Sequence, residues 1–118
     1  MKKLLLSFLI LTGFAAKSQQ VFWEEKSTGF LTAATNETDI SYAPNDPSIV
    51  WVYASAGDGS GDFYQEWGRS LDGGETWTVG NINIGSTDLA IGDICAINAT
   101  TAYIAAFPNA SGVTGGVW

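Results

Sequence analysis

Three acidic residues in the middle of the chain are the first candidates for chemistry. Asp58, Asp62 and Glu66 lie around the glycine-rich stretch GDGSGDF. Two carboxylates held roughly 5–10 Å apart can hydrolyse a glycosidic bond, one as the acid and the other as nucleophile or base. A surface loop in an acidic protein explains the same residues as well, and it is the interpretation we favour.

The same stretch has oxygen-bearing side chains at alternate positions, as calcium loops do. An EF-hand needs glycine at its sixth position and glutamate at its twelfth, where this chain has Phe63 and Arg69. The stretch is therefore not an EF-hand. We expect a flexible loop between two strands and no cofactor, with a surface calcium site as the alternative.

A second cluster, SLDGGETW at residues 70–77, combines two carboxylates, two glycines and a tryptophan. Strands are expected on both sides of it, so its middle should form a hairpin turn, which Asp-Gly and Gly-Gly favour. Asp72 can accept hydrogen bonds from backbone N–H groups of the turn, and Ser70 can add another. Trp77 is expected to pack under the turn and between neighbouring structural units. These roles predict a structural turn rather than a reactive site.

Other reactive groups are scarce. The chain has no histidine, which excludes a Ser-His-Asp triad and histidine metal ligands within it. Cys95 is the only cysteine, so no internal disulfide can form. It lies in the apolar run AIGDICAIN and is expected to be a small buried side chain.

The elements that would position these residues all read as strands. Apolar stretches are short, aromatic and β-branched, they are separated by Gly, Asn, Asp and Pro, and none has helical periodicity. The sequence therefore predicts an all-β fold. The expected strands are Asp39–Tyr42, Ser48–Ala54, Phe63–Ser70 and Thr76–Val79.

The strand pattern then starts again. DICAI from Asp93 resembles DISYA from Asp39, 54 residues earlier, and TAYIAA from Thr101 resembles IVWVYA from Ile49, 52 residues earlier. GVW at 116–118 falls about 50 residues after the strand that contains Trp67. A repeat of this length with four strands in each unit is typical of a β-propeller.

The repeat predicts about one and three-quarter four-stranded antiparallel blades, one over about 36–80 and a partial one over about 88–118. A propeller closes with about four to eight blades, and such units cannot bury their apolar faces alone. Residues 19–118 are thus expected to be the N-terminal part of a longer propeller. A separate small β-sandwich is the alternative.

The turn adds a family resemblance. Ser70, Asp72, Gly74, Thr76 and Trp77 match every signature position of SxDxGxTW, so the stretch resembles an Asp-box, or BNR repeat. Asp-boxes occur in the propellers of sialidases, sortilin-type receptors and xyloglucanases. The resemblance implies a structural hairpin between the third and fourth strands of a blade, usually away from the active site.

The resemblance leaves two classes of function open. The favoured class is a non-catalytic, sortilin-like scaffold that binds a protein or polysaccharide. The other is a glycoside hydrolase: APNDPSIVWVYAS resembles the first blade of xyloglucanases, whereas the arginine triad of sialidases is not met by the single arginine, Arg69. Exposed tryptophans could stack on sugars, although packing between blades is their expected use. The tryptophans are Trp23, Trp51, Trp67, Trp77 and Trp118.

Residues 1–18 read as a signal peptide, with Lys2 and Lys3 before the apolar stretch Leu4–Phe14. That stretch is shorter than the roughly 20 residues that span a bilayer. Cleavage after Ser18 would leave two basic and twelve acidic residues, a formal charge of −10. Such a protein should not bind nucleic acid or anionic membranes. The expected location is secreted, at the cell surface or in the periplasm.

Export gives a direct test of this assignment. N-terminal sequencing of the exported protein should begin at Gln19, because small residues precede the predicted cleavage site. An exported or membrane-bound form that still begins at Met1 would contradict it.

Overall fold

The computed structural model describes residues 29–31, 37–57 and 63–118. The predicted signal peptide, Trp23 and the loop Asp58–Asp62 lie outside these residues. The described part is all-β, as predicted, and contains no helix that is long and apolar enough to cross a membrane. Its strands are β1 (Glu37–Ala43), β2 (Asp46–Gly57), β3 (Phe63–Ser70), β4 (Thr78–Asn81), β5 (Leu89–Ala96), β6 (Ala102–Pro108) and β7 (Gly116–Val117).

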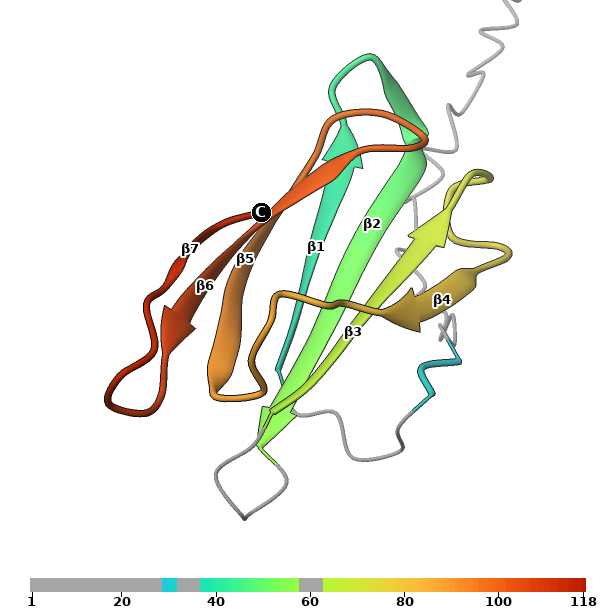
Figure 1. Cartoon of the computed structure of the whole chain (residues 1–118). Coiled ribbons are helices and arrows are strands. Elements are labelled where there is room, and N and C mark those ends of the chain that lie inside the picture. Colours follow the sequence, from blue (N-terminus) through green and yellow to red (C-terminus); the bar gives the residue numbers. More distant parts are fainter. Residues whose placement is uncertain (1–28, 32–36, 58–62) are drawn as a thin grey trace, which may run out of the picture.

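The strands form two antiparallel sheets, β1-β2-β3-β4 and β5-β6-β7, each with its neighbours in sequence order (Figure 1). From β4, at one edge of the first sheet, the chain runs across this sheet toward β1 at the opposite edge. It then enters β5, which contacts β1 and β2. This linker is bonded along β3, since Ile82 N–H donates to the Gln65 carbonyl and Phe63 N–H donates to the Thr87 carbonyl. The second sheet therefore meets the first through β5, which contacts both β1 and β2.

The two sheets repeat one another in register. Ile40 faces Val52 across β1 and β2, and Ile94 faces Ile104 across β5 and β6. These pairs are 54 and 52 residues apart, the offsets that the sequence shows. Val117 likewise occupies the position of Trp67. Because side chains alternate between faces, equal register gives both sheets the same two faces.

The turns before β2 and β6 repeat as well. The Asp46 carboxylate accepts hydrogen bonds from the backbone and the hydroxyl of Ser48, at 3.0 and 2.6 Å. At the equivalent positions, the Asn98 side-chain oxygen accepts the same two bonds from Thr100, at 2.8 and 3.0 Å. Asx-turns of this kind fix the start of the next strand. The repeat therefore extends from the strands to their connections.

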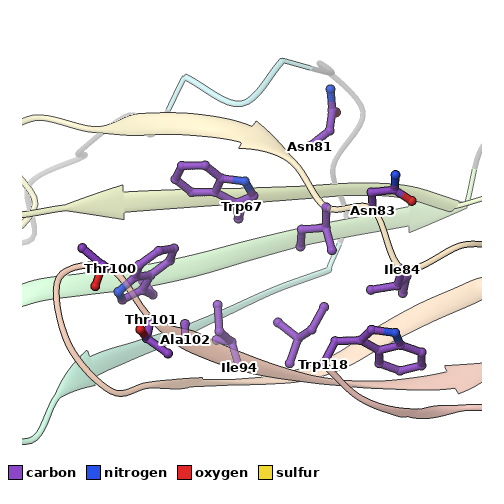
Figure 2. A pocket seen from close by; sticks show the side chains of 12 residues that line it. Trp67, Asn81, Asn83, Ile84, Ile94, Thr100, Thr101, Ala102 and Trp118 are labelled. Atoms are coloured by element: carbon purple, nitrogen blue, oxygen red, sulfur yellow. The ribbon is translucent and has the colours of Figure 1, made fainter.

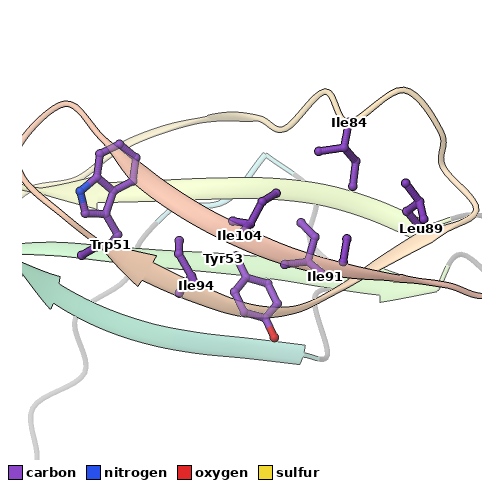
Figure 3. Close-up of a cluster of buried hydrophobic side chains, with 9 residues drawn as sticks. Trp51, Tyr53, Ile84, Leu89, Ile91, Ile94 and Ile104 are labelled. Carbon is purple, nitrogen blue, oxygen red and sulfur yellow. The ribbon is translucent and has the colours of Figure 1, made fainter. Parts of the chain in front are cut away.

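Most of the core lies between the sheets (Figure 3). The first sheet contributes Trp51 and Tyr53, and the second contributes the apolar residues of β5 and β6 that face it. Ile91 is completely buried and Leu89 almost so. The buried cluster consists of Trp51, Tyr53, Ile84, Leu89, Ile91, Ile94, Ala96, Ile104 and Ala106.

On the face of the first sheet away from β5, the side chains of Phe30 and Trp77 cover β2 and β3. A Cβ on Gly68 would lie 2.9 Å from Val52 Cγ2, 3.5 Å from the Trp77 ring and 3.6 Å from the Phe30 ring. Only glycine leaves room for these side chains. Their cover explains why Val52 is buried on this side, and β2 is a strand covered on both faces, as its continuous apolar sequence predicts.

Two details differ from the sequence predictions. Strand β4 begins at Thr78 rather than Thr76, because the Thr76 N–H and hydroxyl bind the Asp72 carboxylate instead of a neighbouring strand. Cys95 is exposed rather than buried. A register shift between Ile91 and Asp93 resets the alternation of β5, so its later apolar positions point inward and Cys95 points outward.

The core can be tested with one substitution. Ile91→Ala should lower the free energy of unfolding by about 2–5 kcal/mol, because it leaves a cavity between the sheets. The matched control Ile97→Ala removes the same atoms from a side chain that is 37% exposed, and should cost much less. Denaturant unfolding measures both. Equal losses would contradict this packing.

Candidate functional site

The stretch SLDGGETW connects β3 to β4 and is held by its own side chains. The Ser70 hydroxyl donates to Asp72 Oδ1 at 2.7 Å and accepts from the Gly74 N–H at 2.8 Å. The Asp72 carboxylate in turn accepts from the backbone N–H and the hydroxyl of Thr76, at 2.9 and 2.5 Å. Ser70 and Asp72 thus satisfy backbone groups that the turn leaves without strand partners.

Backbone and aromatic contacts complete the turn. Gly73 and Gly74 have φ angles of 75° and 97°, a conformation that glycine adopts without strain. The Gly73 N–H donates to the Ser48 carbonyl, and the Trp77 indole N–H donates to the Gly74 carbonyl, both at 2.9 Å. Trp77 packs on its own sheet, on the face away from β5, and not between the two described sheets.

The turn also sets the charge state of its carboxylate. Hydrogen bonds lower the pKa of Asp72 to about 2. The bond from the Thr76 hydroxyl has the largest effect, followed by those from the Thr76 N–H and the Ser70 hydroxyl. Asp72 is exposed and stays ionised at any physiological pH, so it is unsuited to proton transfer near neutrality. The arrangement is that of a rigid turn.

Glu66, the described member of the candidate acid trio, is inside the protein. It is almost completely buried, and its Oε2 accepts a hydrogen bond from the Leu31 N–H at 2.7 Å. Its side chain ties the segment 29–31 to β3, on the face of the first sheet away from β5. Asp58 and Asp62 lie outside the described residues. Nor do the described residues hold a group of three or more Asp, Glu, Cys or His that could bind a metal ion.

A cleft of about 380 Å³ opens between the two sheets (Figure 2). Trp67 of β3 lies on one side of it, and Trp118, which pairs with Ile104, lies on the other. Side-chain amides of Asn81 and Asn83 and hydroxyls of Thr100 and Thr101 add hydrogen-bonding groups. None of the described residues that line it is charged.

Trp51 lines this cleft, and Arg69 contacts Trp51 but does not line the cleft. The Trp51 indole N–H donates to the Asn98 carbonyl at 2.9 Å, and Arg69 Nη1 donates to the Ala99 carbonyl at 2.6 Å. The Arg69 guanidinium lies 5.5 Å from the Trp51 ring centroid, within the range of a cation–π contact. The Trp51 ring packs against Trp67 at 5.5 Å and 43°. These contacts hold the wall rigid.

Sequence reasoning predicted the packing use of Trp51 and Trp67, but not the cleft. Asn81 and Asn83 lie at the end of β4 and just after it, Thr100 lies before β6, and the two segments share no motif. The only available signal was the expected stacking of successive units, which brings the third strand of one unit opposite the next. No family model, no curated protein and no solved structure matches this chain.

Acid titration tests the turn. Because the folded pKa of Asp72 is lower than its ordinary value of 3.8, its contribution to stability is complete above pH about 4 and is lost as the pH falls toward about 2. Thr76→Val removes the hydrogen bond that lowers the Asp72 pKa most, so this pKa should rise toward 3.8 and the stability lost on acidification should shrink. Carboxyl NMR measures the pKa, and acid unfolding measures the stability.

The matched control is Thr78→Val, two residues further along, whose hydroxyl lies outside this network. It should leave the Asp72 pKa near 2. An unchanged pKa in Thr76→Val, or the same rise in both variants, would contradict the proposed bonding.

Proposed function

We propose that this chain is an exported, non-catalytic binding scaffold and that the cleft between its sheets binds a polysaccharide. The observation that carries the proposal is the composition of the cleft wall. It combines indole rings with amides and hydroxyls, the groups that pack on sugar rings and hydrogen-bond their hydroxyls, and its described residues include no acid or base.

The scaffold proposed is a β-propeller of the Asp-box kind, a ring of about four to eight such units carried by one chain or by several. Three features support it: the four strands of the first unit are in sequence order, a linker runs from the last strand of one sheet to the first strand of the next, and the two sheets repeat in register. The internally bonded turn SLDGGETW supports the Asp-box resemblance. Export rests on the predicted signal peptide.

The competing proposal is a xyloglucanase- or sialidase-like hydrolase. It would need two carboxylates that face one substrate. Glu66 faces away from the cleft and already holds the Leu31 N–H, which favours a binding function over hydrolysis.

Binding can be followed by tryptophan fluorescence. Xyloglucan, β-glucan and sialylated oligosaccharides are titrated into the protein, and at least one should give a saturable change. Trp118→Ala should weaken that binding by roughly tenfold or more, as truncation of a central aromatic contact does. The backbone pairing of Trp118 with Ile104 needs no side chain, so the sheet should remain intact.

Tyr64→Ala is the matched control, because Tyr64 and Trp118 are both 40% exposed and Tyr64 lies outside the cleft. It should bind as the wild type does. Equal loss in both variants, or no binding of any probe, would contradict the proposed site. Release of new reducing ends would instead favour the hydrolase.

A further inference from the structure

The contact between the two sheets has two different sides. We call the face of each sheet that carries Ser41 or Cys95 its front, and the opposite face its back. The front of the first sheet packs on the back of the second: the Ser41 hydroxyl accepts a hydrogen bond from the Ala96 N–H at 3.0 Å, and Trp51 and Tyr53 pack against Ile94. The strands in contact are β1 and β2 on one side and β5 on the other.

Because the sheets repeat in register, the back of the first sheet has the same residue positions as the back of the second, which lies in this contact. The front of the second sheet likewise has the same positions as the front of the first. The back of the first sheet presents Ile40, which is 63% exposed, where the second sheet presents Ile94, which is 5% exposed. Tyr42, also exposed, takes the place of the buried Ala96. Ile40 and Tyr42 thus form an apolar surface on the back of β1 that is exposed among the described residues.

The front of the second sheet copies the other side. Tyr103, 51% exposed, stands at the position of the buried Trp51, and Val117 stands at that of Trp67. Cys95 stands at the position of Ser41. A hollow of about 200 Å³ lies on this face, lined by Cys95, Tyr103, Ala105 and Val117 together with Asp93 and Ile104.

We infer that a second copy of this chain docks head to tail, with the front of its β5 and β6 on the back of β1. The internal contact of β1 and β2 with β5 is the template, and it places Ile40 of one copy over the Tyr103 face of the next. Of the described residues, Phe30 and Trp77 lie over β2 and β3 on the back face, whereas Ile40 and Tyr42 of β1 are exposed. Two different surfaces meet, so the contact can continue from copy to copy.

The contact between two copies of the chain should be weaker than the contact between the two sheets within one chain. Cys95 is a poorer hydrogen-bond acceptor than Ser41, and Tyr103 and Val117 offer less ring surface than Trp51 and Trp67. Association should therefore be reversible and depend on concentration.

Sedimentation and light scattering on the chain under reducing conditions test the inference. The wild type should rise from the monomer mass to dimer and larger masses with concentration. Ile40→Glu removes one surface and Tyr103→Glu the other, so each variant alone should stay monomeric. Their mixture should form a one-to-one dimer and nothing larger, because one good surface remains on each. The control Leu71→Glu, on an exposed turn residue outside both faces, should behave as the wild type does.

Circular dichroism verifies that the variants fold, and the pair Tyr42→Glu with Cys95→Glu replaces any variant that does not. A wild type that is monomeric at every concentration would overturn the inference and leave the faces to further units of the same repeat. A mixture that stays monomeric, or a Leu71→Glu variant that no longer associates, would also overturn it. None of these outcomes depends on a polysaccharide.

Discussion

The arrangement of the described residues depends on two side chains of the first sheet that reach the loop before β6. Trp51 and Arg69 stand on neighbouring strands, and each donates one hydrogen bond to a backbone carbonyl of the loop between β5 and β6. A cation–π contact joins the two side chains. Apolar burial alone is non-directional and would let the sheets slide. The two directional bonds lie at the end of the apolar cluster and fix how the sheets are placed.

Other features of the interface follow from that placement. Serine hydroxyls of the first sheet satisfy backbone N–H groups of β5: Ser55 accepts from Ile91 at 3.3 Å, and Ser41 accepts from Ala96. Ile91 lies at the register shift, where a bulge releases backbone groups from regular pairing. Buried backbone donors need a partner, so the hydroxyls allow an irregular strand to be covered. The cleft opens further out, between the later strands of the sheets.

Much of the fold could be predicted from the sequence. Alternation and turn residues gave the all-β class and β3 with its correct bounds, and the repeat offsets gave the equivalence of the sheets. The start of β4 could not be predicted by strand propensity, because hydrogen bonds from Thr76 to Asp72 hold two further residues in the turn. Cys95 was misplaced because an apolar run does not show where a bulge resets the alternation.

The candidate site was less predictable. The residues of SLDGGETW are contiguous, so their roles could be inferred from local chemistry. The burial of Glu66 depends on its contact with Leu31, 35 residues earlier, which no local pattern reveals. The cleft depends on packing between sheets, so its amides and hydroxyls could be identified only once the sheets were placed.

The central claim is that the two sheets pack as successive copies of one unit, fixed by Trp51 and Arg69. The most direct measurement is an isotope-edited NOESY spectrum of the labelled chain, centred on the indole N–H of Trp51. The account predicts cross-peaks from this proton to Asn98 and Ala99, together with slow exchange with water. Cross-peaks confined to the first sheet, with rapid exchange of the indole proton, would contradict it.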